Sequence, residues 1–110
     1  MEFKYLALTN HGNVDGLIKW QRACDAAGIH PLFGCELYVA DDASVKKKGT
    51  PTGHITALIK NQQGWAALCR LLSRANLEGF YYRPRVDVEM LKNEDVSGLV
   101  FLTGCGQSFL

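Results

Sequence analysis

The stretch ITALIKNQQGWAALCRLLSRANLEG, residues 55–79, joins a short apolar run to the clearest amphipathic segment of the chain. The run at 55–59 predicts a strand, and Asn61 is a suitable N-cap for a helix that ends at Gly79. Apolar residues recur at helical spacing and predict the buried face of this helix: Trp65, Leu68, Cys69, Leu72 and Ala75. A strand followed directly by an amphipathic helix is typical of α/β folds.

The remaining segments continue this alternation. Further strands are expected at 4–9, 31–40 and 99–103, and further helices at 14–27 and 88–92. Asn13 and Asp87 are the expected N-caps, and Gly28 is expected to end the first helix. The strands appear apolar on both faces, which predicts a single α/β layer or barrel with much parallel pairing.

Composition places the chain among folded globular proteins. Its 110 residues suffice for one small domain, and 47% of them are hydrophobic. The formal net charge of +1 excludes a strongly basic surface of the kind that binds phosphate backbones without specificity. No apolar run approaches the roughly 20 residues that cross a bilayer, and the start lacks the features of a secretory signal, so we expect a cytoplasmic protein. The four cysteines are widely spread, which favours reduced thiols.

Polar residues with metal-ligand chemistry stand at the predicted strand ends. They are His11, Glu36, His54 and Cys105. Imidazole, carboxylate and thiolate groups hold zinc and related ions, so one interpretation is a metal-dependent hydrolase. The alternative is that these are hydrogen-bonded turn residues and, for Cys105, a small buried side chain. His54 begins its strand whereas the others follow theirs, and spacing alone does not bring it to the same end of the sheet.

The order and the residue identities of four segments indicate a protein family more specifically. They are LALTNHGNVDGL (6–17), GIHPLFGCELYVA (28–40), GHITALIKNQQGWAALCRLLSRANLEGFYYRPRVD (53–87) and GLVFLTGC (98–105). Together they closely resemble the polymerase and histidinol phosphatase (PHP) domain. The runs EGFYYRPRVD and KNQQGW are most similar to the PHP domain that begins the replicative bacterial DNA polymerase III alpha subunits.

This resemblance implies a fold and a chemistry. PHP domains are distorted (β/α) barrels that gather metal ligands at one end, and active members hydrolyse phosphoesters. By resemblance, the four strand-end residues match ligands for divalent zinc, manganese or magnesium. Asn10 stands where the family usually has an aspartate, so its amide would orient the neighbouring imidazole without contributing negative charge. In a replicative parent, the domain would act in 3′ to 5′ exonuclease proofreading or as a structural platform.

The family's opening His-x-His motif would lie before Met1, and its closing Asp-x-His motif would lie after Leu110. The chain is therefore expected to be a partial PHP domain over residues 1–110, about half of the full barrel. We expect such a piece alone to bind metal weakly or not at all, to lack phosphodiesterase activity and to expose strand edges that favour self-association.

Two arginines in the connector at 80–85 are candidates for contacts with phosphate or DNA. Arg83 and Arg85 flank Pro84 and follow two tyrosines, a combination that can bind phosphate or stack on bases. The alternative is a purely structural connector.

Three functional hypotheses remain open from the sequence. The first is a segment of a DNA-replication polymerase, whose partners would be DNA, the other polymerase domains and a proofreading subunit. In this parent, nucleotidyl transfer itself would be carried out by carboxylates far downstream. The second is a stand-alone PHP phosphoesterase, which is disfavoured by the run EGFYYRPRVD. The third is a degenerate fragment without catalysis.

Overall fold

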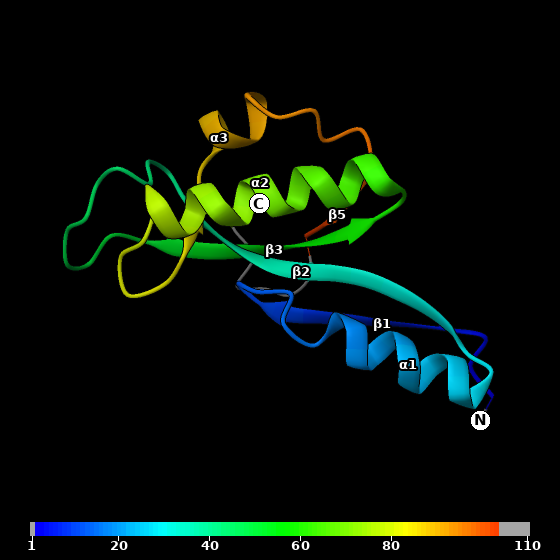
Figure 1. Ribbon diagram of the computed structural model, residues 1–110. Coiled ribbons are helices and arrows are strands. Elements are labelled where there is room, and N and C mark those ends of the chain that lie inside the picture. The colour runs from blue at the N-terminus through cyan, green and yellow to red at the C-terminus, as the bar shows by residue number, and fades with distance from the viewer. Residues whose placement is uncertain (1, 104–110) are drawn as a thin grey trace.

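A computed structural model describes residues 2–103 of the chain. Strands and helices alternate along it except that the third strand follows the second directly (Figure 1). In chain order they are β1 (Tyr5–His11), α1 (Leu17–Ala27), β2 (His30–Ala40), β3 (Thr52–Ile59), α2 (Gln62–Leu77), β4 (Arg85–Val86), α3 (Val88–Lys92) and β5 (Leu99–Leu102). The expected elements are all present, α3 at its expected bounds and the others at shifted ones, and β4 is an additional strand that the sequence did not predict.

The strands form one mixed sheet in the order β1-β2-β3-β5, with β4 paired to β2. β1 and β4 run parallel to β2, whereas the β2–β3 and β3–β5 pairs are antiparallel. The expected parallel pairing therefore holds for two of these four strand pairs, and the other two are antiparallel. The connection at 41–51 contains no helix that could form a parallel crossover, so the chain turns back and β3 returns alongside β2.

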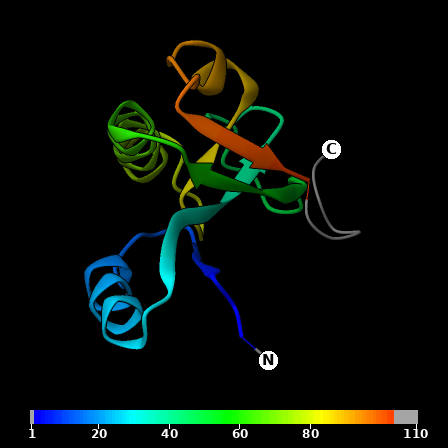
Figure 2. The same ribbon diagram turned by 90° about the vertical axis from the view of Figure 1, so that its right-hand side faces the viewer.

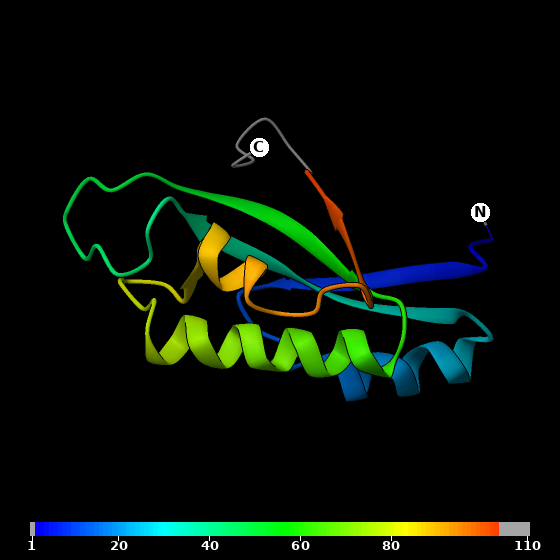
Figure 3. The same ribbon diagram turned by 90° about the horizontal axis from the view of Figure 1, so that it is seen from above.

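Both long helices cover the same side of the sheet. Figures 2 and 3 show α1 and α2 together on one side, and no helix in the described part of the chain lies on the other. The core lies between α2 and the sheet, where Leu68 and Leu71 pack with Cys35, Leu37 and Ala57. Side chains alternate along a strand, so the even-numbered residues of β2 face away from the helices. This helix-free side is called the open face below.

Helix boundaries test the cap predictions. The side chains of Asn61 and Asp87 accept hydrogen bonds from the backbone N–H groups of Gly64 and Met90, which confirms both N-caps. Gly28 closes α1 in the left-handed conformation, as expected. Asn13 is not an N-cap: its side-chain oxygen accepts from the backbone N–H of Asp15 in a local turn, and the helix begins after Gly16.

The predicted buried face of α2 needs a correction. Trp65 is exposed and Cys69 only half-buried, whereas Gly64, Ala67 and Leu71 lie inside with Leu68 and Ala75. The helix is rotated because Gly64 lies directly against the backbone of Gly98, a contact that only a residue without a side chain permits. In the range 2–103, no helix is long and apolar enough to cross a membrane.

Candidate functional site

Three strands bring His11, Glu36 and His54 together on the open face. His11 ends β1 and is the parallel register partner of Glu36 in β2, and its Nε2 lies 3.3 Å from Glu36 Oε2. His54 Nδ1 lies 3.0 Å from Glu36 Oε1. The Glu36 carboxylate therefore lies between the two imidazoles, with one oxygen directed to each, and we call these three residues the His–Glu–His cluster.

Strand direction explains how His54 reaches this position. It stands near the start of β3, and β3 runs antiparallel to β2, so the start of β3 lies beside the end of β2. His54 is the register partner of Tyr38 and reaches Glu36 diagonally across the strand pair. The antiparallel pairing that the sequence analysis did not predict is thus what unites the third member with the other two.

The cluster is sheltered on one side only. The side chains of Glu36 and His54 are 21% and 16% exposed, whereas that of His11 is 61% exposed. Tyr38 lies next to it on the same face, with its ring centroid 6.1 Å from that of His11. A ligand approaching from the open face would meet the His11 imidazole first and then the carboxylate.

Two predicted members of the site are placed differently or fall outside the described residues. Asn10 precedes His11 in β1, and neighbouring residues of a strand point to opposite faces. Its side-chain N–H₂ group donates to Asn13 at 3.5 Å, within the turn, and not to a histidine. The expected orienting contact on an imidazole is therefore absent from this part of the structure. Cys105 lies outside residues 2–103.

The two arginines of the connector lie in different environments, one buried and one exposed. Arg85 is buried, 1% exposed, and its guanidinium donates to the carbonyl oxygens of Gly79, Ala43 and Val45. Its predicted contact with phosphate or DNA is therefore wrong, because Nε and Nη2 donate to these three carbonyls and the whole side chain is shut away from solvent, including an Nη1 that has no partner in residues 2–103. Arg83 is exposed, and its Cζ lies 4.9 Å from the centroid of the Tyr38 ring.

Cys35 lies in β2 directly before Glu36 and points to the opposite, helix-covered side. Burial raises the pKa of its thiol to about 11, against the opposing effect of the backbone N–H groups of Gly12 and Asn13. The thiol is protonated at neutral pH, which makes it a poor nucleophile and metal ligand. Cys24 is also buried, as expected for a packing residue.

Sequence reasoning missed Tyr38, and it noted Tyr82 as one of the two connector tyrosines without predicting its backbone conformation. Tyr38 shares the even-numbered face of β2 with Glu36, so the alternation of the strand could have identified it. Tyr82 has a φ of 61°, the one positive φ of a non-glycine residue in the range 2–103. Such a conformation at a tyrosine carries no local sequence signal, because the side chain itself disfavours it.

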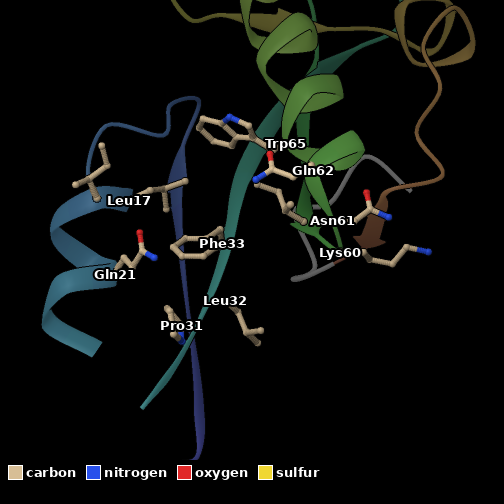
Figure 4. Close-up of a pocket in the computed structure, with 11 residues that line it drawn as sticks. Leu17, Gln21, Pro31, Leu32, Phe33, Lys60, Asn61, Gln62 and Trp65 are labelled. Atoms are coloured by element: carbon tan, nitrogen blue, oxygen red, sulfur yellow. The ribbon is translucent and has the colours of Figure 1, made fainter. Parts of the chain in front are cut away.

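A separate groove of about 590 Å³ lies on the helix-covered side between α1 and α2 (Figure 4). Figure 4 shows Phe33 between the two helices, with Leu17 on one wall and Trp65 on the other. The described residues of its lining include Lys60 but no histidine, carboxylate or cysteine, so this groove lacks the chemistry of the His–Glu–His cluster.

Comparison with protein families matches residues 1–110, the whole chain, to the PHP domain. The chain belongs to the PHP family. This confirms the resemblance inferred from the sequence motifs. The mixed α/β architecture agrees with a segment of such a domain.

Similar proteins specify the kind of PHP domain. The chain is 42% identical over 104 residues to the DNA polymerase III subunit alpha of Chlamydia pneumoniae, with 91% of this chain and 8% of that protein covered. It is 43% identical over 105 residues to the protein of the same name from Thermus aquaticus, again covering 91% and 8%. The chain thus matches the PHP region of DNA polymerase III alpha subunits and spans less than a tenth of their length.

Within this PHP segment, the donor set of the cluster has a clear chemical character. Two imidazoles and one carboxylate are typical ligands of zinc and manganese. In the geometry described for residues 2–103, however, no three His, Cys, Asp or Glu side chains surround a common point at which an ion would be held. The three side chains are paired with one another instead.

Proposed function

We propose that this chain provides one wall of a divalent-metal phosphoesterase site in the PHP region of a replicative DNA polymerase of the DNA polymerase III alpha type. The observation that carries the proposal is the Glu36 carboxylate, which has one oxygen 3.3 Å from His11 and the other 3.0 Å from His54. Three ligand-type side chains from three strands converge although they lie far apart in the sequence. A merely structural sheet has no need of this arrangement on its open face.

The donor chemistry suits zinc or manganese better than magnesium, which prefers oxygen ligands and retained water. His11 and His54 would hold the ion through ring nitrogens that now face Glu36, and the carboxylate would contribute an oxygen. Cys105 is proposed as a further ligand. When bound, the metal would supply Lewis-acid activation of water and neutralise charge on the phosphoryl group.

The residues themselves have distinct tasks in this proposal. Before an ion binds, Glu36 holds the two imidazoles with their ring nitrogens directed to its own carboxylate oxygens, so all three groups already face a common region. His11, the more exposed histidine, presents its ring to an incoming phosphodiester. Tyr38 covers the neighbouring surface and limits the access of bulk water to the cluster from that side.

We also infer that the sheet is part of the wall of a distorted (β/α) barrel. The support is that α1 and α2 cover one side, while the cluster lies on the side that would be the interior. In the described residues, β1 and β5 are the outer strands of the sheet, and further strands could pair there. The cluster would then lie inside a closed barrel.

The replicative context is proposed from the relatives that carry the name DNA polymerase III subunit alpha. DNA and the other domains of such a polymerase are the partners that this context implies. Within it, the cluster favours 3′ to 5′ exonuclease proofreading over a purely structural platform, because a platform does not require ligand-type side chains facing one another.

Paramagnetic broadening by Mn²⁺ tests the proposal. In ¹⁵N-labelled full-length chain, substoichiometric Mn²⁺ should broaden the amide signals around residues 11, 36 and 54 selectively, because relaxation falls steeply with distance from the ion. His30 provides a matched control, since it is the remaining histidine, is exposed, and packs edge-on against Tyr5.

His11→Ala and His54→Ala should each abolish the selective broadening, whereas His30→Ala should leave it unchanged. Uniform weak broadening in the unmodified chain, or equal effects of all three substitutions, would refute a metal site at the cluster. A parallel zinc titration by calorimetry should show the same dependence on the two cluster histidines.

A further inference from the structure

The turn at 81–83 is an exposed but rigidly supported feature beside the His–Glu–His cluster. The backbone N–H of Tyr81 donates to the carbonyl of Arg83 at 3.1 Å, which closes a tight turn with Tyr82 at its apex. Tyr82 is 82% exposed and has a φ of 61°. A positive φ costs a tyrosine conformational energy, and such strained residues cluster at functional sites.

The turn is supported by a contact between two aromatic rings and by a guanidinium group near one of them. The rings of Tyr81 and Tyr82 meet edge to face with centroids 4.7 Å apart. The buried guanidinium of Arg85 also lies near the Tyr81 ring, with Cζ 5.5 Å from the ring centroid. The exposed ring of Tyr82 is therefore held on a support that reaches into the core.

Contacts through Tyr38 connect this turn to the cluster. The Arg83 guanidinium lies over the Tyr38 ring, and the same ring neighbours His11. Pro84 lies close to Gly12, so closely that a Cβ added at Gly12 would meet its Cγ at 3.1 Å. The turn after β1 and the connector before β4 thus pack together, and the Tyr38 ring neighbours both Arg83 and the exposed His11.

The guanidinium of Arg83 has N–H donors available for a ligand. In residues 2–103 it forms no ion pair with a carboxylate, whereas Arg70 and Arg74 each pair with a glutamate. A guanidinium held over an aromatic ring keeps its edge free for bidentate hydrogen bonds to phosphate. An aromatic ring that is exposed and fixed offers a stacking surface that any base can use.

We propose that Arg83 and Tyr82 form a nucleotide-docking site for single-stranded DNA, in which Arg83 binds a backbone phosphate and Tyr82 stacks on the adjoining base. This inference rests on the proposed function and names its substrate class. A small phosphate ester would use Arg83 alone, so the exposed ring of Tyr82 favours a strand with bases. The site would hold the strand next to the cluster and so position its phosphodiester for cleavage.

The test measures DNA binding without metal, so that its outcome is independent of the metal experiment. Fluorescence anisotropy of labelled oligo(dT) of eight nucleotides is recorded with the full chain in EDTA at low salt. We expect a Kd on the order of 10⁻⁴ M, typical of weak backbone binding by a protein with little net charge. Arg83→Gln should weaken binding about tenfold and reduce the salt slope by about 1.

Arg22→Gln is the matched control for charge, because Arg22 is exposed on α1. This substitution should change the affinity less than about twofold. Equal losses for Arg83→Gln and Arg22→Gln would overturn the site, because they would indicate a diffuse charge effect. Absence of detectable binding by the unmodified chain at millimolar protein would overturn it as well, while leaving the metal test unaffected.

Stacking is tested separately at Tyr82. Tyr82→Phe keeps the ring and should bind oligo(dT) normally, whereas Tyr82→Ala should weaken binding about tenfold. With an abasic octamer, Tyr82→Ala should match the unmodified chain. If Tyr82→Ala binds oligo(dT) normally, or if an abasic octamer displaces labelled oligo(dT) as well as unlabelled oligo(dT) does, the stacking assignment is refuted.

Discussion

Glu36 and His54 meet diagonally across the β2–β3 pair, with Oε1 of Glu36 3.0 Å from Nδ1 of His54. Neither is the direct register partner of the other, since Glu36 is opposite Thr56 and His54 is opposite Tyr38. The contact therefore depends on the register of two antiparallel strands. His11 joins it from the parallel strand on the other side of β2, so the Glu36 carboxylate links three strands on one face.

Glu36→Gln tests the stabilising role of this carboxylate. The amide keeps the shape but replaces one acceptor oxygen by a donor and removes the negative charge, so one imidazole loses its partner. We expect the free energy of unfolding in urea to fall by about 1 kcal/mol, because the carboxylate is only partly buried. Glu89→Gln removes a charge from an exposed pair with Lys92 and should change stability by less than about 0.5 kcal/mol. Equal stability of Glu36→Gln and the unmodified chain would contradict a stabilising role.

The sequence indicates the members of the cluster more readily than their assembly. His11 is identified by its type and its place at the end of a strand, and Glu36 by its charge within an apolar strand; the parallel register of β1 and β2 then places them side by side. His54 begins its strand, and only the direction of β3 decides whether it meets the others. Strand direction depends on how the chain returns after the loop at 41–51, which residue types in the strands do not specify.

Gly64→Ala tests the contact that sets the rotation of α2. A Cβ at position 64 would clash with the backbone carbonyl of Gly98. Backbone atoms cannot move aside as the end of a flexible side chain can, so α2 itself would have to shift. We expect a loss of about 3 kcal/mol or more in the free energy of unfolding, measured by urea denaturation with circular dichroism.

Gln63→Ala is the control within the same helical turn, because Gln63 is exposed and alanine is the better helix former. It should leave stability unchanged or raise it slightly. A Gly64→Ala chain as stable as the Gln63→Ala chain would show that α2 can move away from Gly98 without cost.

The same contact explains why Trp65 does not lie on the buried face of α2, although Leu68, Leu72 and Ala75 are buried as predicted. Hydrophobic spacing favours a stripe that contains Trp65, because tryptophan is the largest apolar side chain of the segment. The close approach of Gly64 to Gly98 turns the helix so that Gly64 and Ala67 face inward with the buried leucines, and Trp65 faces outward beside the groove of Figure 4. Periodicity describes apolar surface and does not register backbone contacts, so it could not predict this rotation.

The buried thiol of Cys35 should make the free energy of unfolding depend on pH in the alkaline range. Its pKa of about 11 in the folded chain lies above the ordinary value of 9.0, because burial disfavours the thiolate. Between these two values the unfolded chain releases a proton that the folded chain retains. The thiol's contribution to stability is therefore complete below pH 9 and declines as the pH rises toward 11.

The comparison chain is Cys35→Ala, which lacks this titration but retains every other alkaline group. From pH 8.5 to pH 11, the free energy of unfolding of the unmodified chain should fall by about 2 kcal/mol more than that of Cys35→Ala. Parallel stability curves for the two chains would place the Cys35 pKa at its ordinary value.

Arg83 and Arg85 show where residue type alone fails to assign a role. Both flank Pro84 and carry the same charge, yet one is exposed over Tyr38 and the other is buried among carbonyl groups. The difference follows from β4, a pair of residues that adds to the edge of β2 and draws Arg85 inward. A two-residue strand has no detectable period, so the sequence offers no basis for separating the two arginines.

Arg85→Met tests the structural role of the buried guanidinium. Arg85 donates to the carbonyls of Ala43 and Val45 at 2.9 and 3.2 Å and thereby fastens the loop that carries the lysines at 46–48. Methionine fills much of the space but leaves these carbonyls without a donor, so the loop should open more often. Under native conditions, we expect trypsin to cleave at 46–48 about tenfold faster, as measured by mass spectrometry of the products. A loss of about 1.4 kcal/mol in local stability corresponds to that factor.

Arg83→Met is the control, because it removes the same charge from the exposed position, and it should leave the cleavage rate unchanged. Equal acceleration by both substitutions would show that charge, and not the bonds of Arg85 to the loop, controls its opening.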